Sequence, residues 1–269
     1  MGIHSTNKMK ISIIIPAYNE EKRIGDTLEN YSEYFSKALK IKKLGDYEIL
    51  VVINNTKDKT EEIVKTFQKR NSRINYLNLK QGGKGNAVLR GFEEILKKDF
   101  DLIGFVDADM ATPAKEFFKL AENIGNSDGI IANRYLSGSK IHPPLSFRRL
   151  LVGKIFNYLV RMLFLLPYTD TQCGAKIFSV AASNEIVKTS IISNWAFDVD
   201  LLYNLYKKGY MIKQLSTEWY ERDQGKLRVI NATLEMVLAV VQLRIVNSRL
   251  KNLLRPLSPL IKRIWRKLK

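Results

Sequence analysis

The sequence contains very few residues of the kinds that form disulfides or bind soft metals. Among its 269 residues there is one cysteine, Cys173, and there are two histidines, His4 and His142. A single cysteine cannot form an internal disulfide, which excludes a disulfide-stabilised secreted scaffold and fits a reducing compartment. A structural zinc site is not expected from so few ligands. We expect Cys173 to be a small buried residue rather than a nucleophile.

Long hydrophobic runs are absent as well. No stretch reaches the ~18 consecutive apolar residues of a membrane-spanning helix, and residues 1–9 do not resemble a signal peptide. Acidic residues are missing from residues 236–269, which contain nine Lys and Arg and so carry +9 of the formal net charge of +17. Such a basic region indicates an anionic partner, which could be nucleic acid, a phosphorylated substrate or an acidic lipid.

The first half of the sequence alternates between strand and helix patterns. Apolar runs typical of buried strands occur at residues 11–15, 47–53, 74–79, 102–106 and 129–133. Helical periodicity occurs between them, at residues 21–39, 59–69, 86–97 and 114–124. This alternation predicts an α/β fold with a mainly parallel, doubly wound sheet. In such sheets ligands bind beyond the carboxyl ends of the strands.

The second half contains three apolar segments interrupted by basic residues. Residues 145–166 are apolar almost all round, which indicates a helix buried in protein, at a dimer interface or against lipid. Residues 233–254 are also strongly apolar, with Arg244, Arg249 and Lys251 interrupting the apolar run. Residues 258–269 place an apolar stripe opposite basic side chains, as in helices that lie in a membrane interface, although packing on the chain's own domain is the alternative. We therefore expect a folded α/β domain over residues 1–228 and basic amphipathic helices over 229–269.

Asp107-Ala108-Asp109 is the most informative motif, and it directly follows a predicted strand. Two carboxylates at the carboxyl end of a strand form a hard oxygen site, although a solvated turn is the alternative. Mg²⁺ or Mn²⁺ carrying a diphosphate suits such a site, because these ions keep positions for water and phosphate oxygens. Lys84 lies in a glycine-rich loop, where the backbone can come close to a phosphate.

Four further motifs accompany this pair of carboxylates. They are residues 13–21 (IIIPAYNEE), 82–87 (GGKGNA), 170–176 (DTQCGAK) and 195–202 (WAFDVDLL). Together with Asp107-Ala108-Asp109 they resemble family 2 glycosyltransferases of GT-A fold. The last two motifs narrow the resemblance to dolichyl-phosphate β-glucosyltransferases and related polyprenyl-phosphate hexose synthases. The resemblance covers residues 10–228.

The resemblance implies a reaction. A nucleotide sugar, UDP-glucose first and GDP-mannose or UDP-N-acetylhexosamine next, donates its hexose with inversion to a polyprenyl phosphate at the cytoplasmic membrane face. Mg²⁺ or Mn²⁺ held by Asp107 and Asp109 would neutralise charge on the departing diphosphate. The acceptor phosphate has a second pKa of ~6 and is largely a dianion at neutral pH, so it needs cations to place it rather than a strong general base.

The resemblance also assigns roles to individual residues. The residues expected at the donor nucleotide are Pro16, Tyr18, Glu20, Asn54, Lys84 and Ala108. The residues expected around the reacting groups are Asp107, Asp109, Arg134, Asp198, Arg222 and Lys226. Tyr18 would stack on the base and Glu20 would accept a hydrogen bond from the ribose. Arg134 would bind phosphate through its planar guanidinium group rather than stabilise the fold.

Several alternatives stay open at this level. Tyr18 could be a core aromatic, Arg134 a surface charge, and Asp198 a capping or salt-bridge residue. The family often has an Asp pair after the second strand, where this sequence has Ile53-Asn54, so the donor's identity is in doubt. The acceptor could also be another lipid or a lipid-linked glycan, and an inactive membrane- or nucleic-acid-binding protein is the non-enzyme alternative. We expect no nucleic-acid binding, because the basic tail alternates with aliphatic residues rather than stacking aromatics. The oligomeric state is open.

Overall fold

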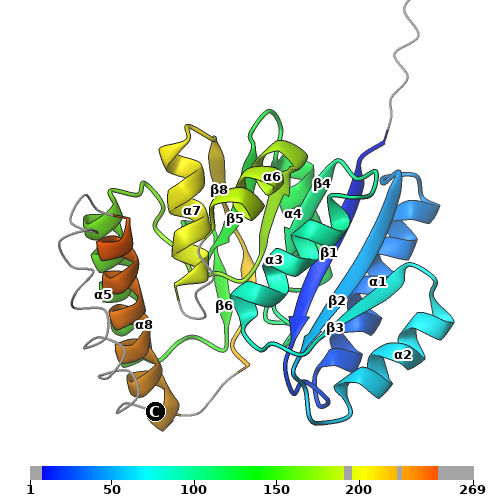
Figure 1. The fold of residues 1–269 in the computed structure, drawn as a ribbon, viewed down its shortest axis with the longest axis horizontal. Helices are drawn as coiled ribbons and strands as arrows, with labels where there is room; N and C mark the ends of the chain where they lie inside the picture. Colours follow the sequence, from blue (N-terminus) through cyan, green and yellow to red (C-terminus); the bar gives the residue numbers. More distant parts are fainter. Residues whose placement is uncertain (1–7, 191–195, 223–225, 248–269) are drawn as a thin grey trace, which may run out of the picture.

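The computed structural model describes residues 8–190, 196–222 and 226–247, and its centre is a seven-stranded sheet (Figure 1). In spatial order the strands are β3 (Ile74–Leu79), β2 (Asp46–Asn54), β1 (Lys10–Ala17), β4 (Leu102–Phe105), β7 (Lys176–Ser179), β5 (Gly129–Asn133) and β8 (Ile212–Ser216). All five strands predicted from the sequence are present, within one or two residues of the expected bounds.

The sheet is mainly parallel, as predicted. Strand β1 pairs in parallel with β2 and β4, β2 with β3, and β5 with β8. Strand β7 is antiparallel to both β4 and β5, and the sequence analysis did not anticipate it. Because β7 runs in the opposite direction, it begins at the edge where the parallel strands end. The motif at residues 170–176 is thereby brought to the carboxyl edge of the sheet.

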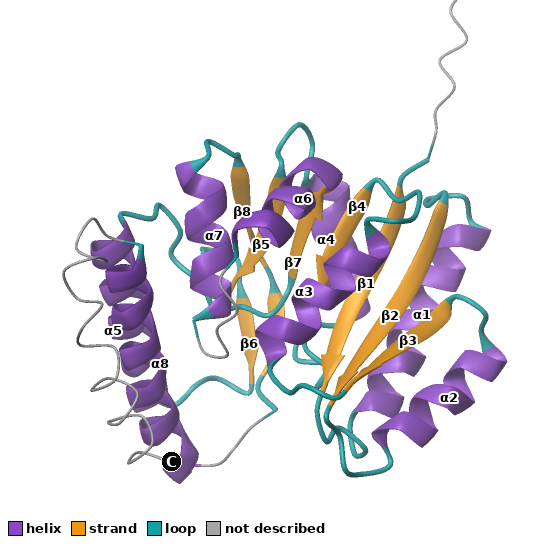
Figure 2. Ribbon diagram, viewed as in Figure 1, coloured by secondary structure: helices purple, strands orange, loops and turns teal. Residues whose placement is uncertain are grey.

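Helices cover both faces of the sheet (Figure 2). One face is covered by α1 (Ile24–Lys40), α2 (Thr60–Arg70) and α4 (Ala114–Asn123), and the other by α3 (Lys84–Ile95), α6 (Val180–Thr189) and α7 (Phe197–Lys207). Alternate residues of β1 enter the two hydrophobic cores: Ile13 lies in the first and Ile14 in the second. This period of two is the strand geometry that fills a core on each face.

Two long helices, α5 (Phe147–Phe164) and α8 (Lys226–Val246), pack side by side at one end of the sheet (Figure 1). Phe156 and Val160 of α5 and Val240 of α8 join the second core. Helix α5 confirms the helix expected in the apolar segment 145–166, and α8 overlaps the one expected at 233–254. The interfacial helix expected at 258–269 lies outside the described residues and stays a prediction. Among the helices described, none is long and apolar enough to span a bilayer.

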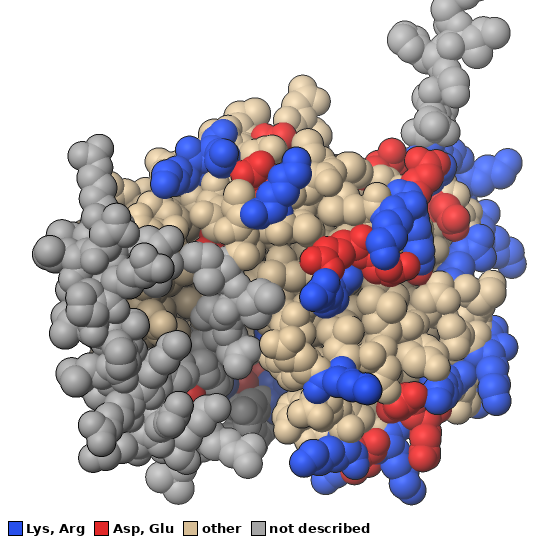
Figure 3. Space-filling view, in the orientation of Figure 1, with Lys and Arg blue, Asp and Glu red and all other residues tan. Residues whose placement is uncertain are grey.

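A small second sheet and the surface charge complete the fold. Strands β6 (Lys140–His142) and β9 (Glu218–Tyr220) pair in parallel beside the main sheet. On the face drawn in Figure 3, the described Lys and Arg side chains lie among Asp and Glu. The described part of that face therefore carries mixed charge rather than one positive patch.

Candidate functional site

A cavity of about 730 Å³ lies at the carboxyl edge of the sheet, where the sequence predicts ligand binding. We call it the main cavity. Nine of the twelve predicted site residues line it: Pro16, Tyr18, Glu20, Asn54, Lys84, Asp107, Ala108, Asp109 and Asp198. Tyr18 is 53% exposed, so it is not a core aromatic. Gln172 and Met236, which were not predicted, also line this cavity.

The two carboxylates of the Asp107-Ala108-Asp109 motif differ in their surroundings. Lys84 Nζ lies 2.6 Å from Asp107 Oδ1. Burial alone would raise the pKa of Asp107, but the Lys84 ammonium outweighs it and lowers that pKa. Burial, followed by the negative charge of Asp107, raises the pKa of Asp109. Asp107 is therefore firmly ionised, while the charge on Asp109 is poorly compensated by the protein.

This pair fits a divalent cation that also binds a diphosphate. Within the described residues, no group of three or more His, Cys, Asp and Glu could hold a metal by itself. The protein would thus supply two carboxylates, and ligand and water oxygens would complete the coordination, as is usual for Mg²⁺ in phosphate sites. Burial also raises the pKa of Glu20 against the opposing effect of Arg23, and the negative charges of Asp109 and Asp107 add to this rise. A cation would offset this excess of negative charge.

The glycine-rich loop before α3 is fastened by Asn54. This side chain is 3% exposed. Its Nδ2 donates to Ala17 O at 3.1 Å, and its Oδ1 accepts from Gly83 N at 3.1 Å. Gly83 has a φ of +117°, in the region that favours glycine, and it immediately precedes α3. Because Gly83 has no side chain to cap the helix, the first N–H groups of α3 can serve an anion beside Lys84.

A buried lysine, Lys176, was missed by the sequence analysis. Its side chain is fully buried, and its Nζ donates to Asp198 Oδ1 at 2.5 Å and to Cys173 O at 2.6 Å. Asp198 Oδ2 lies 3.8 Å from Lys84 Nζ, so Asp198 stands between two lysines. Asp200 is fully buried and accepts from Asn204 instead. Of these two aspartates, Asp198 therefore lines the main cavity and Asp200 does not.

The motif at residues 170–176 also supplies a glycine on which Asp107 depends. A Cβ placed on Gly174 would lie 1.9 Å from Asp107 Oδ2 and 3.0 Å from its Oδ1. No side chain can be accommodated there unless the carboxylate moves. Next to it, burial raises the pKa of the Cys173 thiol to about 11, which agrees with the expected buried, unreactive cysteine.

Replacing Gly174 with alanine should therefore lower kcat by about 10²-fold, the scale for losing one well-placed charged group. The Asp107 carboxylate would have to leave its present position, while the fold should persist. Initial rates and circular dichroism would measure the two effects. Gly25→Ala is the matched control, since a Cβ there would meet only Ile63 and Phe67 at 3.9 Å. Normal turnover of Gly174→Ala would show that the position of Asp107 is not critical.

Arg134, which follows β5, is not a surface charge. Its side chain is 15% exposed and pairs with the fully buried Asp170, Nε to Oδ2 at 2.8 Å and Nη2 to Oδ1 at 3.0 Å. Burial opposes the charge on each partner, but the pair lowers the pKa of Asp170 and raises that of Arg134. The guanidinium also lies 5.1 Å from the centroid of the Trp219 ring. Arg134 is therefore held within the fold by Asp170, and its role at phosphate stays a prediction.

A second cavity, of about 280 Å³, adjoins the main cavity. Arg134, Arg149 and Trp219 line it, and Gln172 and Met236 line both cavities. The Nε2 of Gln172 is buried without a hydrogen-bond partner among the described residues. Buried polar groups of this kind usually have a ligand or water as partner. The one sequence feature that marks Arg149 is its position at the start of an apolar helical segment, which does not predict that it lines a cavity.

Two predicted residues are not placed in these cavities. Arg222 is exposed, its Nη2 lies 3.5 Å from Met110 O, and its guanidinium lies over the Tyr220 ring. It lines neither the main nor the second cavity. Lys226 is the first residue of α8, and its side chain lies outside the described part of the structure. The roles suggested for these two residues stay predictions.

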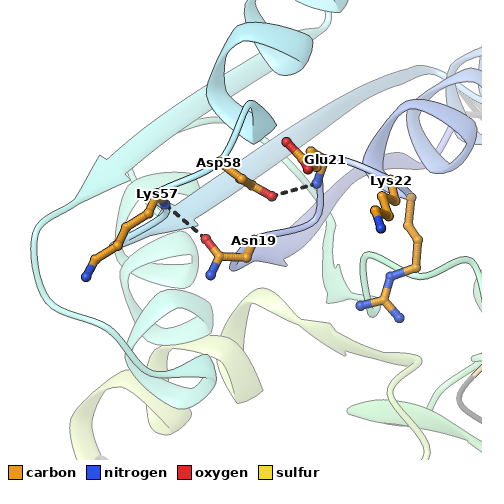
Figure 4. A pocket seen from close by; sticks show the side chains of 6 residues that line it. Asn19, Glu21, Lys22, Lys57 and Asp58 are labelled. Carbon is orange, nitrogen blue, oxygen red and sulfur yellow. Dashed lines mark hydrogen bonds between the residues drawn. The ribbon is translucent and has the colours of Figure 1, made fainter. Parts of the chain in front are cut away.

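A further cavity, of about 670 Å³, lies between the loops after β1 and β2 (Figure 4). Asn19 Oδ1 accepts from Lys57 N at 2.9 Å, and Asp58 Oδ2 accepts from Glu21 N at 3.0 Å. Asp58 Oδ1 also accepts from Thr60 N, the first residue of α2, at 3.0 Å. These bonds join the loop that carries Tyr18 to its neighbour. We assign these side chains to loop structure.

Comparisons with known proteins agree with this geometry. Residues 12–186 match glycosyl transferase family 2. The dolichyl-phosphate beta-glucosyltransferase of Dictyostelium discoideum is 32% identical over 87% of this chain and 73% of its own length. That of Homo sapiens is 30% identical over 81% and 69%. Glucosyl-3-phosphoglycerate synthase from Mycobacterium tuberculosis, solved with Mn²⁺, UDP and glucosyl-3-phosphoglycerate, superposes with a TM-score of 0.66 at 15% identity, covering 90% of this chain and 82% of that one.

Proposed function

The chain belongs to glycosyl transferase family 2, and we propose that it transfers a hexose from a nucleotide sugar to dolichyl or another polyprenyl phosphate. The observation that carries this proposal is the pair of adjoining cavities. The main cavity contains Lys84 and the carboxylate pair Asp107 and Asp109, and the second contains Arg134 and Arg149. The relatives named as dolichyl-phosphate beta-glucosyltransferases support this acceptor and favour UDP-glucose as donor.

In the main cavity we assign the donor. Tyr18, more than half exposed, is available to stack on the base, and Glu20 to accept from the ribose. Asp107 and Asp109 would hold Mg²⁺ or Mn²⁺, which when bound stabilises negative charge on the leaving diphosphate. Mn²⁺ and UDP occur together in a structural neighbour, which supports this assignment. Lys84 would turn from Asp107 toward the diphosphate. Asn54 holds the glycine-rich loop, so its contact with the base stays a prediction.

In the second cavity we assign the acceptor phosphate. Arg134 and Arg149 bring guanidinium groups to it, paired with Asp170 and with Glu221 at 3.1 Å, and a phosphate would share these donors. Gln172, which lines both cavities, has an unsatisfied donor to offer. A phosphate oxygen attacks the anomeric carbon as the bond from that carbon to the diphosphate breaks. The electron pair of the broken bond leaves with the diphosphate, and attack from the opposite side inverts the centre. The phosphate dianion is itself the nucleophile, so no side chain has to remove a proton.

The place of the reaction follows from its reactants. A polyprenyl acceptor lies in a bilayer, and the one cysteine is a buried free thiol, which suits a reducing compartment. We therefore place the enzyme at the cytoplasmic face of a membrane. The expected place of Arg222 and Lys226 around the reacting groups, and an interfacial role for residues 258–269, are further parts of this proposal.

The direct test is a screen of labelled nucleotide sugars with a polyprenyl phosphate, followed by extraction of the lipid product. We expect UDP-glucose to give the highest yield, and the yield to depend on Mg²⁺ or Mn²⁺. A diacylglycerol and a lipid-linked oligosaccharide serve as rival acceptors in parallel reactions. A labelled product with either of these, and none with polyprenyl phosphate, would reject the proposed acceptor while leaving the glycosyltransferase activity in place.

A further inference from the structure

Helix α5 carries an exposed apolar stripe. Its members, between 46% and 77% exposed, are Phe147, Leu151, Ile155, Tyr158 and Met162, together with Leu165 directly after the helix. They recur every three or four residues, so they share one side of the helix. The other side is buried, where Phe156, Val160 and Phe164 enter the second core. Six large apolar side chains in one exposed row are unusual for a soluble surface and mark an interaction site.

Positive charge borders this stripe on both sides. At about 100° per residue, the five of these side chains that lie within α5 cover an arc of about 80°. Lys154 and Arg161 lie along one border and Arg148 along the other, and all three are exposed. Helix α5 contains no Asp or Glu. An apolar row between cations fits the interface of an anionic bilayer, where the apolar groups enter the acyl region and the long basic side chains reach the headgroups.

The same helix forms a wall of the second cavity. Arg149, Val152, Gly153 and Phe156 of α5 line that cavity, on the opposite side of the helix from most of the stripe. A phosphate held at Arg149 would therefore lie one helix diameter, about 10 Å, from a surface suited to lipid. That is the scale at which an interfacial helix seats in the headgroup region.

We propose that α5 docks the enzyme on an anionic membrane by inserting this stripe, so that the second cavity opens next to the headgroups. The inference rests on the proposed function, because a lipid acceptor is what makes this seating useful. A second copy of the chain is a poorer occupant. If two copies packed stripe against stripe, the basic residues that border each stripe would lie close together and repel one another. Six side chains are also few compared with the ~20–30 residues per side of a stable interface.

The test uses the full chain with Ile155→Glu and Met162→Glu together. The matched control is Ile41→Glu with Met211→Glu, the same residue types at nearly the same exposure, 55% and 62% against 58% and 60%. Co-sedimentation with vesicles of phosphatidylcholine and phosphatidylglycerol, without acceptor, should show a roughly 100-fold weaker partition for the α5 variant, about tenfold for each apolar side chain withdrawn. The control should bind like the unmodified chain.

Charge reversal tests the borders separately. Lys154→Glu with Arg161→Glu should weaken binding to the anionic vesicles and leave binding to pure phosphatidylcholine vesicles unchanged. Both side chains are exposed, so the fold should tolerate the change. Transfer to a short, soluble prenyl phosphate should persist in all these variants. If the unmodified chain binds vesicles but makes no lipid product from any nucleotide sugar, the proposed function fails while the docking surface stands.

Three results would overturn the proposal. The α5 variant could sediment with vesicles as well as the control does. It could lose thermal stability that the control keeps, which would mean that the stripe packs against the chain itself. Or it could convert a dimer into a monomer, by light scattering, without any change in vesicle binding, which would identify a second copy as the occupant.

Discussion

Replacing Asp109 with alanine should lower kcat by about 10²-fold or more, the scale for removing one electrostatic stabiliser. It should also weaken the response of the rate to added Mg²⁺ or Mn²⁺. The reason lies in the difference between the two carboxylates. Asp107 is already engaged by Lys84 at 2.6 Å, whereas burial and Asp107 raise the pKa of Asp109 and leave its charge poorly compensated. A bound dication would therefore stabilise the negative charge of Asp109 more than that of Asp107.

The same substitution should hardly change stability. Asp109 Oδ1 accepts one hydrogen bond, from Ala111 N at 2.9 Å, and its loss is offset by relief of the repulsion between the two carboxylates. We expect a change in the free energy of unfolding within about 1 kcal/mol. Asp99→Ala is the control for loss of one carboxylate, because Asp99 is 91% exposed in a surface pair with Lys10. Full turnover in excess EDTA, after removal of prebound metal, would exclude the metal role.

Much of this site could be predicted because parallel strands bring their ends to one edge. Pro16, Asn54 and Asp107 are far apart in the sequence, but each stands at the end of a strand whose apolar run is plain. Once β1, β2 and β4 are recognised as parallel neighbours, their following loops must meet. Nine residues of the main cavity followed from this rule together with the motifs, whereas Gln172 and Met236 did not.

The parts that were missed depend on pairings that no local pattern reveals. Lys176 begins a four-residue antiparallel strand and is fully buried. A lysine is almost never buried unless it is paired, and its partner Asp198 lies 22 residues away. The partner of Arg134, Asp170, is 36 residues away. Sequence alone assigns such charges to solvent or ligand, since it cannot show which carboxylate the fold brings to them.

Helix α5 shows a different limit of prediction from the sequence. Its sequence is apolar almost all round, so periodicity cannot tell which side faces the core. Only the packing of Phe156 and Val160 against the second core leaves Ile155 and Met162 outside. The sequence therefore does not decide whether this helix is buried in the domain, contacts a second copy or contacts lipid. In the structure one side of α5 is buried in the second core and the other side is exposed.

Replacing Asp170 with alanine should lower the free energy of unfolding by about 3–5 kcal/mol, the usual cost of removing one partner of a buried ion pair. Asp170 is fully buried and accepts three hydrogen bonds from Arg134, two from the guanidinium and one from the backbone N at 3.0 Å. Without it, a guanidinium that is 15% exposed loses its counter-charge. Urea unfolding at neutral pH would measure the change. Asp46→Ala is the matched control, since Asp46 pairs with Arg73 at 3.0 Å but both side chains are more than 40% exposed, and such pairs contribute under about 1 kcal/mol.

The pH dependence separates this pair from simple loss of packing. Burial alone would raise the pKa of Asp170, but Arg134 outweighs it and lowers that pKa below the unfolded value. The stabilisation is therefore fully present above the unfolded pKa, about 4, and it is lost as the pH falls through the lower folded pKa. The difference in stability between the unmodified chain and Asp170→Ala should shrink in acid, whereas a cavity effect would persist. If the difference is under 1 kcal/mol at neutral pH, Asp170 does not hold Arg134 in place. Arg134 would then be free to serve phosphate alone, as the sequence first suggested.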